Sequence, residues 1–385
     1  MAQEFDPAAP AGLYSDGWLG DVLPAVASAL GTPLAGFAPT LELAPTPRAV
    51  VVLVDGLGFD LLQRRRGHAP FLRSLLDDTR RLTAGFPSTT ATSMGTFGTG
   101  RPPGTHGLLG YEVLAPDQGV LLNELTWNLD IDPVTWQPVE TIFETMRRQQ
   151  MPVTFVGPGK FAGSGLTEAA LRGATFSAAD PFDCRVDNAV AAIRAASRGF
   201  VYLYWGFLDR VGHQKGCESY EWGDELAHVD AQLARLADLV PDDCAVLITA
   251  DHGMVDSPEG DRVDIALDPA LAAGVRLVGG EPRCRQLYVD DGATDDVAAA
   301  WTEVLGDRAT VWARAQAVAA GLFGPVRPEA APRIGNVVVA MRDTFSVVDS
   351  RSMSSSQLEL VGHHGSLTSD EVGIPLVTIA PRSAG

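Results

Sequence analysis

Acidic residues and histidines occur at four places in the sequence with the types and spacing of metal ligands. They form an Asp-x-x-x-His pair, an Asp-His pair, a lone Asp after an apolar run and a His-His pair before a glycine: Asp209 and His213, Asp251 and His252, Asp55, and His363 and His364. Residues four positions apart lie on the same face of a helix, so the first pair could bind one ion together. Carboxylate and imidazole ligands without cysteine suit zinc, manganese or iron better than calcium or a structural zinc site.

Each of these residues, taken singly, also has an ordinary structural explanation. An aspartate after a strand commonly caps a helix or forms a turn, and a histidine is commonly satisfied by hydrogen bonds. Their joint occurrence favours metal binding over this explanation. Two sites with about three protein ligands each would leave coordination positions open, as catalytic metals require.

A cluster of hydroxyl residues after Pro87 is a second candidate for chemistry. The sequence Phe-Pro-Ser-Thr-Thr-Ala-Thr-Ser-Met at residues 86–94 predicts a helix start, where free backbone N–H groups favour anions. A hydroxyl beside a metal ion could ionise there and attack phosphorus. The structural alternative is a helix cap followed by a Ser/Thr-rich first turn, and the segment alone does not decide between the two.

Apolar runs that alternate with helical patterns must position these residues. Strands are predicted over residues 49–54, 152–156, 200–205, 245–249 and 374–380, and helices over residues 18–30, 59–76, 186–196 and 221–239. This alternation predicts an α/β fold with a mostly parallel central sheet and helices on both faces. Ligands of such sheets bind beyond the carboxyl ends of the strands, which is where several of the candidate residues stand.

Two regions interrupt this alternation. Short strand-like pieces predict a β-rich excursion over residues 106–136, and a Pro- and Gly-containing stretch predicts an inserted cap subdomain over residues 256–334. The predicted core therefore consists of residues 1–255 and 335–385.

The composition limits the classes of partner. The chain has 385 residues, 46% of them hydrophobic, and a formal net charge of −19, which argues against binding a nucleic-acid polymer. An acidic protein that handles phosphoesters needs local positive charge, and metal ions would supply it. The four cysteines are widely separated, so a disulfide framework is not expected. No signal peptide and no run of about 20 apolar residues is visible, which predicts a cytoplasmic protein without a membrane span.

Taken in order, the motifs resemble the alkaline phosphatase superfamily, and within it the nucleotide pyrophosphatase/phosphodiesterase branch. The most specific are Asp-x-x-Gly-His at residues 209–213 and Thr-Ala-Asp-His-Gly-Met at residues 249–254; the others are at residues 50–56, 85–87, 99–100, 106–107 and 364–365. The resemblance covers residues 48–255 and 335–382. It implies an alkaline phosphatase-like fold and two-metal hydrolysis of small-molecule phosphate esters.

The resemblance also implies the ligands of each metal. One ion would be bound by Asp209, His213 and His364, and the other, with the nucleophile nearby, by Asp55, Asp251 and His252. His364 is preferred because the histidine of the family directly precedes a glycine, with His363 as the alternate. Zn²⁺ is the expected metal, and Mn²⁺ or iron are alternatives.

Two features of the family point to different nucleophiles. Its nucleophilic threonine lies ten residues before the glycine of a Thr-Gly pair, and here Thr99-Gly100 selects Thr90. The common Thr-Phe-Pro-Asn motif would instead place the nucleophile at Gly85, which has no hydroxyl. We therefore expect Thr90, with Thr89 as the alternate.

Two further residues are candidates for substrate binding. Tyr111 stands near the position of an asparagine that holds a phosphoryl oxygen in the family, and Lys160 is one of very few lysines. Tyr111 could equally be a core residue, and for Lys160 an exposed loop position is favoured over a contact with phosphate. The expected reaction is hydrolysis of phosphodiesters or nucleotide pyrophosphates through a phosphothreonine. A phosphomonoesterase or a phosphoryl-transfer enzyme of the same superfamily is the alternative, and a non-catalytic binding protein is disfavoured because no ligand type is missing.

Overall fold

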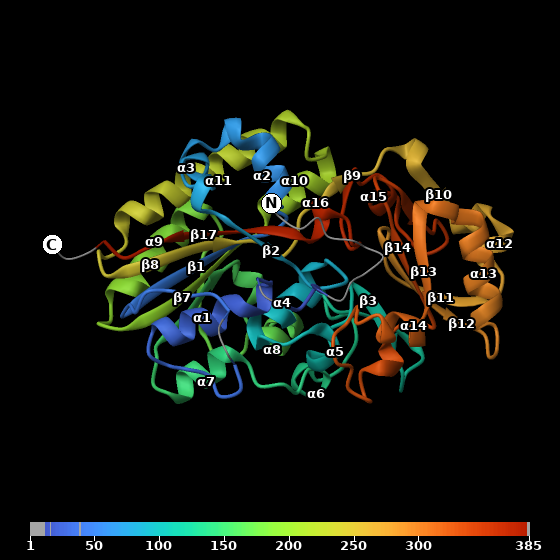
Figure 1. Ribbon diagram of the computed structural model, residues 1–385, viewed down its shortest axis with the longest axis horizontal. Coiled ribbons are helices and arrows are strands. Elements are labelled where there is room, and N and C mark those ends of the chain that lie inside the picture. The colour runs from blue at the N-terminus through green and yellow to red at the C-terminus, as the bar shows by residue number, and fades with distance from the viewer. Residues whose placement is uncertain (1–11, 16, 38–39, 383–385) are drawn as a thin grey trace.

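A sheet of seven strands forms the centre of the computed structural model, which describes residues 12–15, 17–37 and 40–382. The strand order is β2-β17-β8-β1-β7-β5-β6 (Figure 1). The strands are β1 (Arg48–Val54), β2 (Arg80–Thr83), β5 (Val153–Gly157), β6 (Thr175–Ala178), β7 (Gly199–Trp205), β8 (Cys244–Thr249) and β17 (Gly373–Ile379). β17 runs antiparallel to both of its neighbours, β2 and β8, and the other pairs of these strands are parallel. The predicted mostly parallel α/β sheet is confirmed.

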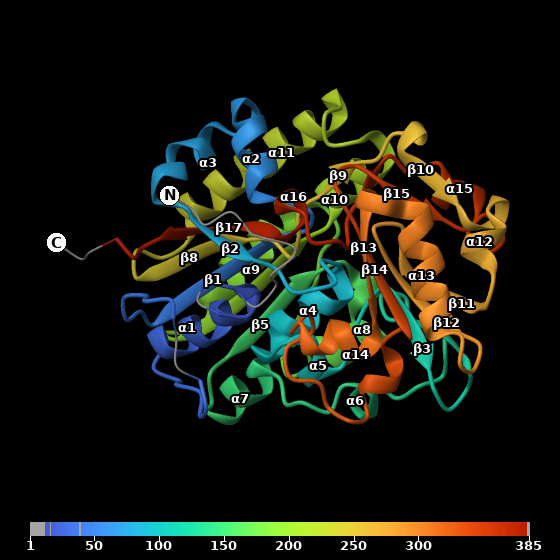
Figure 2. The same cartoon turned by 45° about the vertical axis from the view of Figure 1, so that its right-hand side comes forward.

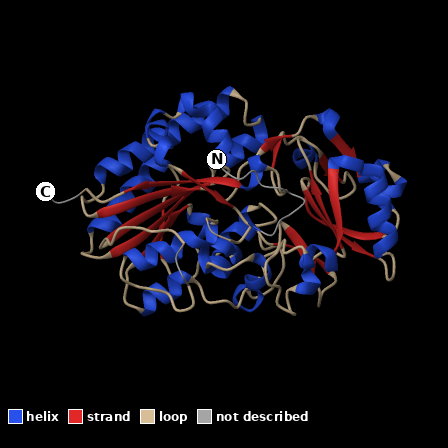
Figure 3. Ribbon diagram, viewed as in Figure 1, coloured by secondary structure: helices blue, strands red, loops and turns tan. Residues whose placement is uncertain are grey.

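The central strands are buried on both faces. β7 and β8 consist entirely of buried residues, and in β1 only Arg48 is partly exposed, as expected for apolar runs beneath two helical layers. Helices α2 (Phe59–Arg65), α3 (Pro70–Ser74) and α11 (Tyr220–Leu239) cover one face, and α1 (Val22–Ala29), α4 (Thr90–Thr99) and α7 (Ile142–Arg148) cover the other (Figures 1 and 3). The remaining helices of this part are α5 (Pro103–His106), α6 (Pro133–Trp136), α8 (Gly165–Ala170), α9 (Phe182–Arg194), α10 (Phe207–Lys215) and α16 (Ser369–Val372). Among the described helices, none combines the length and the apolar character needed to cross a bilayer.

A second, antiparallel sheet lies beside the central one (Figure 2). Its order is β11-β12-β14-β13, with β11 (Val275–Glu281), β12 (Cys284–Val289), β13 (Ala309–Ala313) and β14 (Val337–Met341). Helices α12 (Pro269–Ala272), α13 (Thr294–Leu305), α14 (Arg314–Ala319) and α15 (Ser355–Leu358) and the paired strands β10 (Arg262–Asp264) and β15 (Ser346–Val348) belong to the same part of the chain. This sheet has a hydrophobic cluster of its own that includes Leu287, Trp301 and Val337.

The predicted β-rich excursion contains a hairpin of β3 (Glu112–Ala115) and β4 (Val120–Asn123). Its Leu114 N–H donates to the hydroxyl of Tyr288 in β12 over 2.9 Å. The hairpin therefore contacts the second sheet, although Leu114 and Tyr288 are 174 positions apart in sequence.

The predicted end of the inserted subdomain, at residue 334, does not match the end of the second sheet. β14 begins at Val337 and pairs with both β12 and β13, so this strand is part of the second sheet. The run Val337-Val338-Val339 has the same apolar character as a strand of the central sheet, and only its hydrogen-bonded partners distinguish the two.

A buried ion pair joins the second sheet to the segment before β17. Arg283, in the turn between β11 and β12, donates from Nε and Nη2 to the carboxylate of Glu371 in α16 over 3.1 and 2.7 Å, and neither side chain is exposed. Glu371 also accepts from the backbone N–H of Ser366 at 2.9 Å. The pair therefore fixes the loop that carries His364 to the inserted sheet.

Glu371→Ala should destabilise the protein strongly, because it leaves a buried guanidinium without its counter-charge. We expect the free energy of unfolding to fall by about 3–5 kcal/mol. Asp370→Ala is the matched control, since its pair with Arg64 is partly exposed and should contribute about 0–1 kcal/mol. Urea denaturation of both variants measures the difference, and equal small losses would contradict the importance of this pair.

Candidate active site

The candidate ligands converge because they follow three neighbouring strands. Asp55 directly follows β1, and Asp251 lies two positions after the end of β8, which pairs with β1 on one side. On the other side β1 pairs with β7, which leads into α10, where Asp209 and His213 lie four residues apart. The last ligand, His364, comes from the loop between β16 (Gly362–His363) and α16.

The turn after Asp55 requires a glycine. Gly56 has a φ of 74°, and a Cβ on it would lie 3.0 Å from the Cα of Asp209. A side chain would therefore strain the backbone and push α10 away from the end of β1. The Asp-Gly sequence brings together ligands of the two predicted metal sites.

Asp55, Asp251 and His252 form the first cluster. The Nε2 atom of His252 lies 3.3 Å from Oδ1 of Asp55 and 3.4 Å from Oδ2 of Asp251. The Nδ1 atom of the same ring is 2.9 Å from the carbonyl oxygen of Gly253, where it donates its proton. This hydrogen bond leaves the lone pair on Nε2, facing two carboxylate oxygens, which is the arrangement of a metal-binding histidine.

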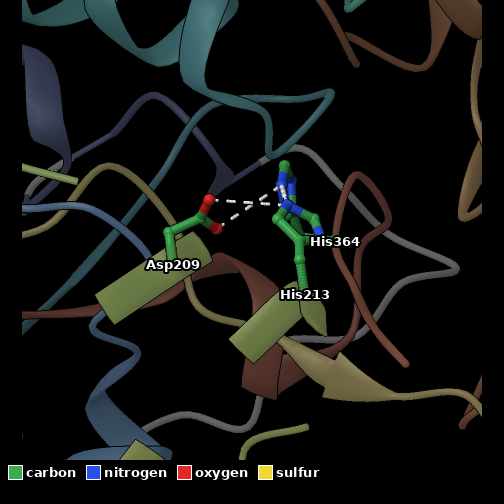
Figure 4. A group of neighbouring side chains, drawn as sticks. All are labelled: Asp209, His213 and His364. Carbon is green, nitrogen blue, oxygen red and sulfur yellow. Dashed lines mark hydrogen bonds and ion pairs between the residues drawn. The ribbon is translucent and has the colours of Figure 1, made fainter. Parts of the chain in front are cut away.

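Asp209, His213 and His364 form the second cluster (Figure 4). The Nδ1 atoms of His213 and His364 lie 2.7 and 2.9 Å from the carbonyl oxygens of Gly362 and Ser88, respectively. Their Nε2 atoms face each other at 3.2 Å, and Oδ2 of Asp209 lies 3.5 Å from Nε2 of His213. Because both Nδ1 protons are donated to carbonyl oxygens, the lone pairs of the two Nε2 atoms face each other and repel. A cation bound between the two Nε2 atoms would be attracted to both lone pairs.

The carboxylate oxygens of the three aspartates indicate whether cations fit the two clusters. Oδ1 of Asp55, Oδ1 of Asp209 and Oδ2 of Asp251 are buried, and none has a hydrogen-bond donor among the described residues. Burial and the carboxylates of Asp251 and Asp209 raise the pKa of Asp55 well above its usual value, as expected for anions gathered without compensation. Two divalent cations would satisfy these oxygens, so the residues present fit the predicted metals.

The electrostatics of His364 agree with a ligand role. Burial and the neighbouring His252 and His213 lower the pKa of His364 well below its usual value, so the ring is neutral and its Nε2 is available to a cation. The rings of His252 and His364 stack with centroids 3.7 Å apart. The two clusters are therefore adjacent.

Thr90 is the first residue of α4 and lies beside the first cluster. Its Oγ1 is 3.2 Å from Nε2 of His252, and its side chain is 9% exposed, which leaves little room for bulk water. The hydroxyl of Ser93, one turn on, donates to the carbonyl of Asp251 over 2.8 Å and fixes the helix to the loop after β8. Gly85 is the position that the Thr-Phe-Pro-Asn motif would select for the nucleophile. A Cβ on Gly85 would lie 3.5 Å from side-chain atoms of Pro103 and Thr96.

Of the other predicted residues, Tyr111 and His363 lie at the active-site cavity and Lys160 does not. Tyr111 lines a cavity of about 270 Å³ that is also bordered by Thr90 and the second cluster. His363 lines this cavity too but belongs to neither cluster, and its Nε2 lies 3.2 Å from the carbonyl of Leu360. Lys160 is exposed, with Nζ 5.3 Å from the ring centroid of Phe161, and does not line the cavity.

Two charged residues of the second sheet line the same cavity and were not predicted from the sequence. Glu281 ends β11; its Oε2 lies 3.4 Å from Nδ1 of His364, and its buried Oε1 has no partner among the described residues. Burial raises the pKa of this carboxyl well above its usual value, and a hydrogen bond from Thr89 opposes the rise. Arg285 lies in β12 and is 4% exposed. The sequence signal near them is Gly280, whose φ of 70° and close approach to Cys284 mark a tight turn.

Three solved structures have a similar fold over most of the chain. An inactive threonine-to-alanine variant of murine ectonucleotide pyrophosphatase/phosphodiesterase 5, in complex with AMP, has 18% identity and a TM-score of 0.68 over 87% of this chain and 88% of that chain. The human protein has 18% identity and a TM-score of 0.70 over 87% and 88% of the two chains. Phosphonoacetate hydrolase from Sinorhizobium meliloti 1021, in complex with phosphonoformate, has 19% identity and a TM-score of 0.67 over 89% and 92%. At these identities the likeness establishes the fold.

Comparison with curated proteins gave no match. A family model described as type I phosphodiesterase / nucleotide pyrophosphatase matches residues 49–367, which include both clusters and Thr90. The match spans most of the chain and agrees with the resemblance that the motifs carry. The chain therefore belongs to the type I phosphodiesterase / nucleotide pyrophosphatase family of the alkaline phosphatase superfamily.

Proposed function

We propose that the protein hydrolyses phosphodiesters or nucleotide pyrophosphates with two divalent metal ions and Thr90 as the nucleophile. The family indicates phosphoester hydrolysis as the general reaction. The observation that carries the proposal is the pair of three-residue clusters with unpartnered carboxylate oxygens, beside which the Thr90 hydroxyl lies. The inactive murine variant, in which alanine replaces a threonine, supports a threonine nucleophile.

The first cluster would hold one ion and the second cluster the other, with zinc favoured by the carboxylate and imidazole ligands and manganese or iron as alternatives. When bound, the ions would lower the pKa of the nucleophilic hydroxyl and balance the charge of the phosphoryl oxygens. The backbone carbonyls of Gly253, Gly362 and Ser88 orient the three imidazoles, since each accepts an Nδ1 proton.

Thr90 performs the covalent step. Its Oγ1 attacks phosphorus in line with the leaving oxygen, and the bond from phosphorus to that oxygen breaks. The alcohol of a diester, or the phosphate of a nucleotide pyrophosphate, departs, and the threonine proton is passed to this leaving group. The helix start contributes backbone N–H groups that favour the anionic phosphoryl group on the threonine. Water then attacks phosphorus, the bond to Oγ1 breaks, and a proton returns to the Thr90 oxygen.

Two cavities meet at Thr90, and this supports a substrate with two ester groups. The larger cavity is lined by Glu281, Arg285 and other polar residues, whereas a smaller one of about 50 Å³ is lined mainly by apolar and aromatic residues. Thr90 and Leu125 line both. A diester has one substituent for each of the two cavities, whereas a monoester has only one substituent. A phosphomonoesterase or a phosphoryl-transfer enzyme would use the same clusters and is the alternative.

Purified protein should contain close to two transition-metal ions per chain, and Asp209→Ala or His213→Ala should lose about one of them together with activity. His363→Ala is the matched control, because this adjacent histidine belongs to neither cluster and its loss should leave the metal content unchanged. Inductively coupled plasma mass spectrometry measures the content. Unchanged metal in both cluster variants would show that the ligands are wrong.

Thr90→Ala should lower kcat by several orders of magnitude while both metals stay bound, because it removes only the attacking oxygen. Thr90→Ser should retain part of the activity. Thr89→Ala should be far milder, since it removes one hydrogen bond to Glu281, a change of about 1 kcal/mol in stability. The measurement is kcat with metal content checked. An inactive Thr89→Ala and a nearly normal Thr90→Ala would move the nucleophile to Thr89.

The wild-type protein should hydrolyse bis(p-nitrophenyl) phosphate with a higher kcat/KM than p-nitrophenyl phosphate, because a diester occupies both cavities. The two assays share a chromophore and are run at equal metal concentrations. A clear preference for the monoester would identify a phosphomonoesterase and would leave the metal sites in place.

A further inference from the structure

Two arginines of the second sheet, two residues apart, differ in their counter-charges. Arg283 forms a two-point ion pair with Glu371 and is fully buried. Arg285 is nearly as buried, with 4% exposed, yet no carboxylate of the described residues comes within 4.0 Å of its guanidinium. Arg285 also lines the active-site cavity, whereas Arg283 does not.

The guanidinium of Arg285 is fixed by two contacts, but most of its N–H donors have no acceptor among the described residues. Its Nε donates to the carbonyl of Val347 over 2.8 Å, and its Nη2 lies 3.2 Å from the sulfur of Met353. A guanidinium carries five N–H donors, so three have no partner among the described residues. Burial lowers the pKa of Arg285 to about 10, which still leaves it cationic at neutral pH.

The acidic residues nearest to Arg285 do not supply the missing partner. Glu281 contacts His364 and the hydroxyl of Thr89. Glu112, on β3, lines the cavity but forms no ion pair with the guanidinium. Asp349 also lies near Arg285 but forms its ion pair with Arg351 over 2.7 Å. A buried cation without a close anion is unfavourable, and a fixed planar guanidinium presents parallel donors that match two oxygens of one anion.

We propose that Arg285 binds a second oxyanion of the substrate, a carboxylate or a further phosphate, remote from the phosphorus that Thr90 attacks. The proposal rests on the proposed function and narrows its substrates to phosphoesters with an additional negative group. The reacting phosphoryl group belongs beside Thr90 and the two clusters, with which Arg285 has no hydrogen bond or ion pair. A substrate that spans the cavity would reach Arg285 with its other end.

Two diesters that differ only in the remote charge test the proposal: p-nitrophenyl 2-carboxyethyl phosphate and p-nitrophenyl propyl phosphate. Metal-loaded wild-type protein should prefer the carboxyethyl ester by about tenfold in kcat/KM, the effect of one charge-assisted pair of hydrogen bonds. Arg285→Met should abolish this preference, because it should lower kcat/KM for the carboxyethyl ester about tenfold more than for the propyl ester. Arg285→Lys should keep part of the preference. Arg276→Met is the matched control, since Arg276 is an exposed residue of β11 and does not line the cavity.

An equal rate of both esters with the wild-type protein, or an equal loss of both in Arg285→Met, would overturn the proposal and leave Arg285 a structural residue. If the metal-loaded wild-type protein hydrolyses neither ester, the proposed function fails separately, and binding then decides the role of Arg285. Calorimetry with 2-carboxyethylphosphonate and propylphosphonate, which contain no ester bond, should give tighter binding of the former to wild-type protein by about tenfold and equal binding to Arg285→Met. Equal binding of both ligands to the wild-type protein would overturn the proposal.

Discussion

Three imidazoles, two of them buried and that of His213 partly buried, donate their Nδ1 protons to backbone carbonyls. This leaves three Nε2 lone pairs among carboxylate oxygens that have no donor in the described part of the chain. Bringing these groups together costs electrostatic free energy. Burial and like charges raise the pKa of Asp55, while burial and neighbouring histidines lower the pKa of His364, so the charged form of each group is disfavoured. Cations at the two clusters would remove this cost, and the fold around them serves to hold the ligands together.

Two parts of the structure, the central sheet and the inserted sheet, hold the six ligands together. The carboxyl ends of β8, β1 and β7 supply five of the six ligands from adjacent strands and the helix after β7. The sixth, His364, arrives from a loop that the Arg283–Glu371 pair attaches to the inserted sheet. The insertion therefore contributes both to the position of a ligand and, through Glu281 and Arg285, to the wall of the cavity.

The sequence predicts the core of the site because the chemistry is local to strand ends. A buried β-branched run followed by an aspartate defines a strand end, and parallel strands bring such ends to one edge. The roles of residues in the inserted part are harder to predict from the sequence. Arg283 and Arg285 are the same residue type two positions apart, and only the distant Glu371, which pairs with Arg283, distinguishes their roles. The same dependence on distant partners explains why the second sheet extends to β14, beyond the boundary predicted at residue 334.

Anomalous diffraction from crystals of the purified protein, recorded at the absorption edge of the metal it contains, would locate the bound ions. We expect two peaks about 4 Å apart, one bonded by Nε2 of His252 and the other by Nε2 of both His213 and His364. A single peak, ligation through Nδ1, or peaks outside the two clusters would contradict the two-metal site.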